Sequence, residues 1–151
     1  MKRLYLTAMT VSACLTACQG ELPERAAAQL EPFAPPPEAE FDCVFSEVSE
    51  ASEEKLPVLV TLETDGVERA EASYGGERLS LYAADGESGD GVKEFAIAEY
   101  PGFDVRLETT EVGGGTMPGT RVLSGRVELR TYEAGEARVV SALDVAGTCH
   151  G

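Results

Sequence analysis

From about residue 41 to its end, the chain consists of short runs in which apolar and polar residues alternate. Successive side chains of a β-strand point to opposite faces, so each run predicts a strand with one buried face. Dipeptides typical of tight turns, such as Asp65-Gly66 and Gly75-Gly76, separate several of the runs. We count about eight runs: 41–45, 58–63, 70–74, 79–83, 95–97, 103–108, 127–131 and 139–149. The pattern predicts an all-β domain, a small antiparallel barrel or sandwich.

The first residues have the pattern of a signal peptide. Lys2 and Arg3 precede an apolar run over residues 4–15, which is shorter than the roughly 20 residues of a membrane-spanning helix. The segment Leu15-Thr16-Ala17-Cys18 that follows resembles the lipobox of bacterial lipoproteins. The resemblance implies cleavage before Cys18 and lipidation of its thiol. The alternative is an ordinary secretory signal that contains a cysteine.

The resemblance also implies where the protein resides. In Gram-negative lipoproteins the residue after the lipidated cysteine influences sorting, and here it is Gln19 rather than Asp. This implies an anchor in the outer membrane, facing the periplasm. Two or more acyl chains are needed for stable anchoring, and lipoprotein processing supplies them.

A proline-rich segment connects the lipidation site to the strand-rich region. Five of the eight prolines lie within residues 19–40, including the run Pro35-Pro36-Pro37, which favours an extended polyproline II conformation. We therefore expect a signal peptide over residues 1–17, a lipidated Cys18 with a disordered tether over 18–40, and an acidic β-domain over 41–151.

Two of the four cysteines remain after cleavage and lipidation. Cys14 leaves with the signal peptide and Cys18 carries lipid, so Cys43 and Cys149 form an even pair in an oxidising compartment. Each shares the strand phase of apolar neighbours, so both thiols are expected to point inward. We predict that they form a disulfide that brings the first and last strands together. Free thiols, or a metal site completed by His150, are the alternatives.

The charge of the chain restricts its partners. The formal net charge of −15 becomes −17 when Lys2 and Arg3 are removed with the signal peptide. Such a surface repels nucleic-acid phosphates, so no nucleic-acid partner is expected. It suits a basic protein partner, although a solvated surface that keeps the protein soluble is the simpler interpretation.

Few residues suggest chemistry. The only histidine, His150, lies next to the C-terminus, and Ser88 lacks the glycine pattern of a nucleophile elbow. The glycine-rich residues 113–120 lack the Lys-Ser or Lys-Thr of a phosphate-binding loop and are expected to form a mobile loop between two strands. We therefore expect no enzyme activity, no cofactor and no metal site.

One loop stands out as a candidate for binding. It contains Asp85, Glu87, Ser88, Gly89 and Asp90. Its acids do not follow the spacing of a calcium-binding EF-hand loop. We assign it as a candidate binding loop.

The layout of the chain is similar to that of the membrane-bound inhibitors of c-type lysozyme. These are lipoproteins with a short tether, a small antiparallel β-barrel and cysteines near the domain ends, and they inhibit through a Ser-Ala-Ser-Gly-type loop. Here only Ser88-Gly89 matches that loop, and the usual downstream tryptophan is missing because the chain has none. We expect a non-catalytic interaction or structural module. The resemblance implies the alternative, an inhibitor of a basic cell-wall hydrolase.

Overall fold

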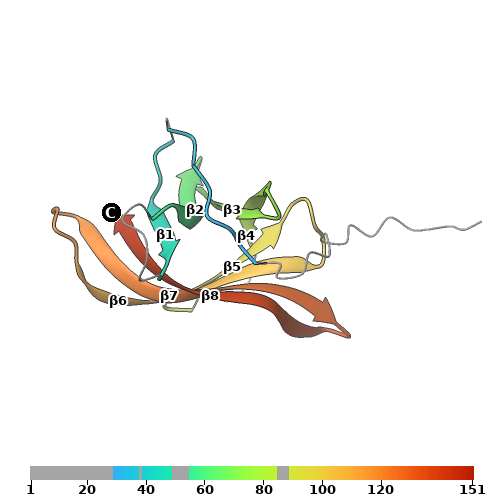
Figure 1. Ribbon diagram of the computed structural model, residues 1–151. Coiled ribbons are helices and arrows are strands. Elements are labelled where there is room, and N and C mark those ends of the chain that lie inside the picture. The colour runs from blue at the N-terminus through green and yellow to red at the C-terminus, as the bar shows by residue number, and fades with distance from the viewer. Residues whose placement is uncertain (1–28, 38, 49–54, 85–88) are drawn as a thin grey trace, which may run out of the picture.

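The chain folds into a closed β-barrel of eight antiparallel strands, in which each strand pairs with the next along the chain (Figure 1). The computed structural model describes residues 29–37, 39–48, 55–84 and 89–151. The strands are β1 (Cys43–Glu47), β2 (Pro57–Thr64), β3 (Val67–Tyr74), β4 (Glu77–Ala83), β5 (Val92–Ile97), β6 (Phe103–Gly114), β7 (Thr120–Glu133) and β8 (Glu136–His150). The predicted all-β fold is confirmed, and the arrangement is a barrel rather than a sandwich.

The barrel closes where its first strand pairs with its last. Cys43 of β1 lies directly opposite Cys149 of β8 in the register, and their Cα atoms are 4.0 Å apart. The two residues form a disulfide, which confirms the predicted pairing. The bond therefore joins the strands at the closure of the barrel and leaves neither as an exposed edge.

Tight turns set the register of the hairpins. Asp65-Gly66 connects β2 to β3 and has positive φ at both residues, 55° and 74°. Positive φ at both central positions is the geometry of the hairpin turn that follows the right-handed twist of the strands. The sequence predicted this turn, whereas the same geometry at Ala134-Gly135 between β7 and β8 was not expected.

Cross-strand pairs show which residues face the interior. Phe45 of β1 pairs with Leu59, and Phe95 of β5 pairs with Val105. Paired residues share a face, and all four of these side chains are buried. Inward-facing apolar side chains from all eight strands form one continuous core.

β6 and β7 are much longer than the sequence pattern predicted, β8 is slightly longer, and the hairpins of these strands project past the barrel (Figure 1). Val139 was expected to share the buried face of Leu143 and Val145, but it is 54% exposed. Val140 is an extra residue opposite the Leu129–Arg130 step, so the register shifts there and the strand bends. The start of β8 is therefore part of a solvent-exposed hairpin, although its sequence alternates like that of a core strand.

The packed region begins before the predicted domain boundary at residue 41. Leu30, which we expected in the disordered tether, is 2% exposed and belongs to the core. It pairs with Tyr74, and the amide of Phe33 donates a hydrogen bond of 2.9 Å to the carbonyl of Pro57. Residues 30–33 therefore lie between the ends of β2 and β3. Burial of the Leu30 and Phe33 side chains removes apolar surface from water and so favours this position.

Candidate functional site

The two ends of the barrel differ in how they are filled. The turns that join β3 to β4 and β5 to β6 lie at one end, where Leu30, Tyr74, Ile97, Tyr100 and Phe103 contribute apolar side chains to the core. The Tyr100 hydroxyl donates a hydrogen bond of 2.6 Å to Glu77, and this bond is the main cause of a raised Tyr100 pKa. We call this the filled end of the barrel.

The opposite end opens into a cavity of about 450 Å³. Such a volume lies within the roughly 300–1,000 Å³ typical of small-molecule sites. Phe45, Leu107, Leu123 and the Cys43–Cys149 disulfide contribute its apolar surface. We call this the open end; it carries the turn between β2 and β3, the described ends of the β4–β5 connection, and the β6–β7 turn.

The polar lining consists of inward-facing residues beyond the last core position of each strand. Lys93 precedes Phe95 by two residues, Thr109 follows Leu107 by two, and Arg121 precedes Leu123 by two. Because alternate residues of a strand share a face, these side chains continue the inward rows into the cavity. None of these three residues was predicted from the sequence, because the end of an apolar run looks like the end of a buried face.

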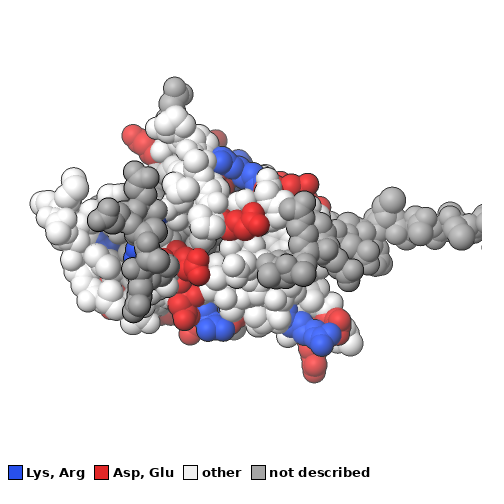
Figure 2. Space-filling view, in the orientation of Figure 1, with Lys and Arg blue, Asp and Glu red and all other residues white. Residues whose placement is uncertain are grey.

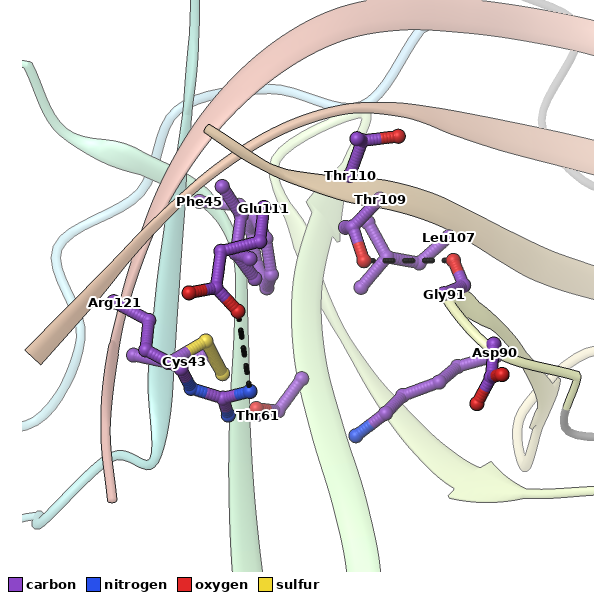
Figure 3. Close-up of a pocket in the computed structure, with 13 residues that line it drawn as sticks. Cys43, Phe45, Thr61, Asp90, Gly91, Leu107, Thr109, Thr110, Glu111 and Arg121 are labelled. Atoms are coloured by element: carbon purple, nitrogen blue, oxygen red, sulfur yellow. Dashed lines mark hydrogen bonds and ion pairs between the residues drawn. A yellow bond between two sulfur atoms is a disulfide. The ribbon is translucent and has the colours of Figure 1, made fainter. Parts of the chain in front are cut away.

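The charges at the cavity are unequally paired. Lys93 forms an ion pair with Glu68, and Arg121 approaches Glu111 at 4.0 Å. Figure 3 shows Glu111 and Arg121 on one side of the cavity and Asp90 on the opposite side. Within the described part of the chain, Asp90 has no hydrogen bond or ion pair.

The cavity wall contains a buried polar atom, the hydroxyl oxygen of Thr61. Thr61 on β2 is 2% exposed, and its hydroxyl has no hydrogen-bond partner among the described residues. Thr61 pairs in register with Cys43, so its side chain faces inward, and it lines the cavity (Figure 3). A buried hydroxyl without a hydrogen bond costs about 1–3 kcal/mol, so a polar group inside the cavity would relieve this cost.

The structure places part of the predicted binding loop at this site. Asp90 lines the cavity and Gly89 precedes it, whereas Asp85, Glu87 and Ser88 lie outside the described residues. The loop joins β4 to β5, so its described ends lie at the open end of the barrel.

The alternative roles considered for the cysteines and His150 find no site in the described structure. Both thiols are joined in the disulfide. His150 lines a separate hollow with Glu40, Phe41, Asp42 and Val44. In residues 29–151, apart from the gaps, no group of three or more His, Cys, Asp or Glu side chains is arranged to hold a metal ion. Cys18, the predicted lipidation site, lies outside the described residues.

The glycine-rich residues 113–120 form the end of β6, a turn and the start of β7. Val112 is an extra residue in the β6–β7 pairing and is exposed, as is Met117 in the turn. Both lie close in sequence to the cavity residues Glu111 and Arg121. Two exposed apolar side chains therefore accompany the polar ones at the open end.

Phe45 forms part of the cavity wall because it packs over a glycine. It lies opposite Gly147 in the β1–β8 register, and a β-carbon at Gly147 would overlap two carbons of the Phe45 ring. We predict that Gly147→Ala lowers the free energy of unfolding by about 1–3 kcal/mol, as expected for overpacking in a core. Urea denaturation of Gly113→Ala is the control, since a β-carbon there meets no atom within 4 Å. Equal stability of the two variants would contradict the prediction.

A second polar cluster lies on the outer face of the sheet. The Arg130 guanidinium donates two hydrogen bonds of 2.8 Å to Asp104 and one of 2.8 Å to Glu94. The Tyr132 hydroxyl donates a third to Asp104, and this bond is the main cause of a raised Tyr132 pKa. The acceptors Glu94 and Asp104 lie on β5 and β6, and both donors lie on β7. The cluster therefore connects three neighbouring strands, and we assign it a structural role.

A scan against protein-family models and searches of curated proteins and solved structures each gave no significant match. Among the described residues, no helix has the length and apolar character needed to cross a membrane.

Proposed function

We propose that the protein is a lipoprotein anchored in the outer membrane, and that its barrel is a non-catalytic binding module facing the periplasm. The barrel takes a small ligand through its open end. The observation that carries the proposal is the cavity of about 450 Å³ at the open end, whose wall contains the buried Thr61 hydroxyl without a hydrogen-bond partner in the described part of the chain.

The lipid anchor is supported by the sequence around Cys18. A charged start, an apolar run and Leu15-Thr16-Ala17-Cys18 follow in the order that lipoprotein processing requires. A disulfide between Cys43 and Cys149 is compatible with export, because such bonds persist in oxidising compartments. Only residues 19–29 separate Cys18 from the packed Leu30. This length holds the barrel within about 40 Å of the membrane.

We predict that Cys18→Ala abolishes lipidation and moves the protein from the membrane fraction to the soluble fraction. The thiol is the acceptor of the diacylglycerol, so no other residue replaces it. Labelling with a radioactive fatty acid, followed by fractionation, measures both effects. Cys14→Ala is the matched control and is expected to be labelled normally. Normal labelling of Cys18→Ala would contradict the anchor.

Binding at the open end is tested with N-phenyl-1-naphthylamine, an uncharged apolar fluorophore. The purified full-length chain is expected to raise its fluorescence and to saturate at one equivalent. Leu123→Trp fills the cavity and is expected to weaken binding about tenfold or more. Val140→Trp adds the same side chain on the exposed part of β8 and is expected to bind like the unmodified protein. Unchanged fluorescence, or full binding by a folded Leu123→Trp variant, would contradict the proposal.

The second candidate is inhibition of a basic cell-wall hydrolase by the loop that contains Ser88 and Gly89. Its support is the position of Gly89 and Asp90 at the open end and the acidic charge of the chain. An inhibitor of this kind presents the loop and does not need the cavity. Stoichiometric inhibition of c-type lysozyme that survives Leu123→Trp would therefore favour this candidate over ligand binding.

A further inference from the structure

We propose that the cavity at the open end selects an amphiphilic organic cation, a small amine or quaternary ammonium attached to an apolar body. The inference rests on the proposed function, because it names the class of ligand for the same cavity. Three properties of the lining support it: an unpaired carboxylate, an apolar wall and one buried hydrogen-bonding group.

The unpaired carboxylate favours a cation. Both basic residues of the lining face a carboxylate, Lys93 that of Glu68 and Arg121 that of Glu111. Asp90 lines the same cavity without an ion pair or hydrogen bond to any described residue. One negative charge therefore remains unneutralised, and a ligand cation would pair with it.

The apolar wall favours an amphiphile over a simple ion. Phe45 and Leu107 are buried core residues that also line the cavity, together with Leu123 and the disulfide. An apolar body seated there leaves water, which is the main source of affinity in such pockets.

The Thr61 hydroxyl adds a requirement for a hydrogen bond. It is buried in the cavity wall without a hydrogen-bond partner among the residues that the structure describes, and it can both donate and accept a hydrogen bond. A ligand with a hydroxyl or carbonyl group beside its apolar body would satisfy it. We therefore expect an amino alcohol to bind more tightly than the corresponding simple amine.

The negative net charge of the protein also favours a cationic ligand. The formal charge is −15, and Figure 2 shows carboxylates exposed on one face of the barrel. Such a field concentrates cations near the surface and repels anions, so it speeds entry of a cationic ligand.

The test is displacement of N-phenyl-1-naphthylamine from the full-length chain by ligands with the same eight-carbon body. Octylamine is expected to displace it at a concentration about tenfold lower than octanol, and octanoate is expected to be the weakest. Asp90→Asn should weaken octylamine about tenfold and leave octanol unchanged. Glu136→Gln is the matched control, because it removes an exposed charge on the distant β7–β8 hairpin.

A second comparison tests the buried hydroxyl. 2-Amino-1-octanol is expected to displace the fluorophore at lower concentration than octylamine, and Thr61→Val should abolish this preference. Preference that persists in the Thr61→Val variant would contradict the role of Thr61.

The outcomes separate this inference from the proposed function. Equal displacement by octanoate and octylamine, or equal octylamine affinity in Asp90→Asn and Glu136→Gln, would overturn the cation selectivity while the binding module stands. Failure of the fluorophore itself to bind would overturn both.

Discussion

Replacing Cys43 or Cys149 with alanine is expected to lower the free energy of unfolding by about 2–5 kcal/mol. The disulfide joins residues separated by 106 positions, so it restricts nearly the whole unfolded domain. It also lies where β1 pairs with β8, so its loss loosens the closure of the barrel. Urea denaturation of the oxidised protein measures the effect.

The double variant distinguishes a shared bond from two independent contributions. Either substitution breaks the same bond, so Cys43→Ala with Cys149→Ala should be little less stable than each single variant. In reductant, the unmodified protein should approach the stability of the variants. Additive losses, or alkylation of both cysteines before reduction, would contradict the account.

Replacing Arg130 with methionine is expected to destabilise the protein by about 3–5 kcal/mol. Arg130 is 8% exposed and Asp104 is 9% exposed, so the pair is largely removed from water. Without the guanidinium, the buried Asp104 carboxylate keeps only the hydrogen bond from Tyr132, whereas Glu94 still lies 3.9 Å from Arg106. The loss arises mainly from the uncompensated charge of Asp104, since a well-paired buried ion pair adds little net stability.

A second substitution distinguishes the cost of an unpaired carboxylate from the net contribution of the ion pair. Arg130→Met combined with Asp104→Leu should recover most of the loss, because it removes both charges of the pair. Arg138→Met is the control; its 2.7 Å ion pair with Glu133 is exposed on the β7–β8 hairpin. That substitution should cost about 1 kcal/mol or less. Equal costs for Arg130→Met and Arg138→Met in thermal or urea unfolding would contradict the structural role of the cluster.

Sequence reasoning predicted the strands, because alternation and turn residues are local signals. Asp65-Gly66 required only its own backbone geometry, and it forms the predicted turn. The pairing of Cys43 with Cys149 was also predictable. It followed from elimination of the other cysteines and from the inward phase of both residues, which the register confirms.

The extent of the core was less predictable because it depends on contacts far apart in sequence. Proline content predicted an extended tether around Leu30 and Phe33, but the gap between the ends of β2 and β3 gives these side chains a place to bury. Val139 and Leu143 occupy the same phase of the alternating pattern, yet only Leu143 is buried in the barrel core. Alternation alone does not tell a core strand from a solvated hairpin.

The candidate site shows the same limit. Asp90 was found through the composition of its loop, whereas Thr61, Lys93 and Arg121 looked like polar positions of ordinary strands. They meet only because closure of the barrel aligns β2, β5 and β7 around one end. Alternate residues of a strand share a face, so the residue two positions beyond the last core residue also points inward. Lys93, two residues before Phe95, could have been identified in this way.

A heteronuclear NMR titration of the full-length chain with N-phenyl-1-naphthylamine would show whether a ligand enters the open end of the barrel. If it does, we expect saturable shift changes to gather on the cavity residues Thr61, Leu107, Thr109 and Leu123. Changes centred on Leu30 at the filled end, or spread over the outer faces of the strands, would contradict it.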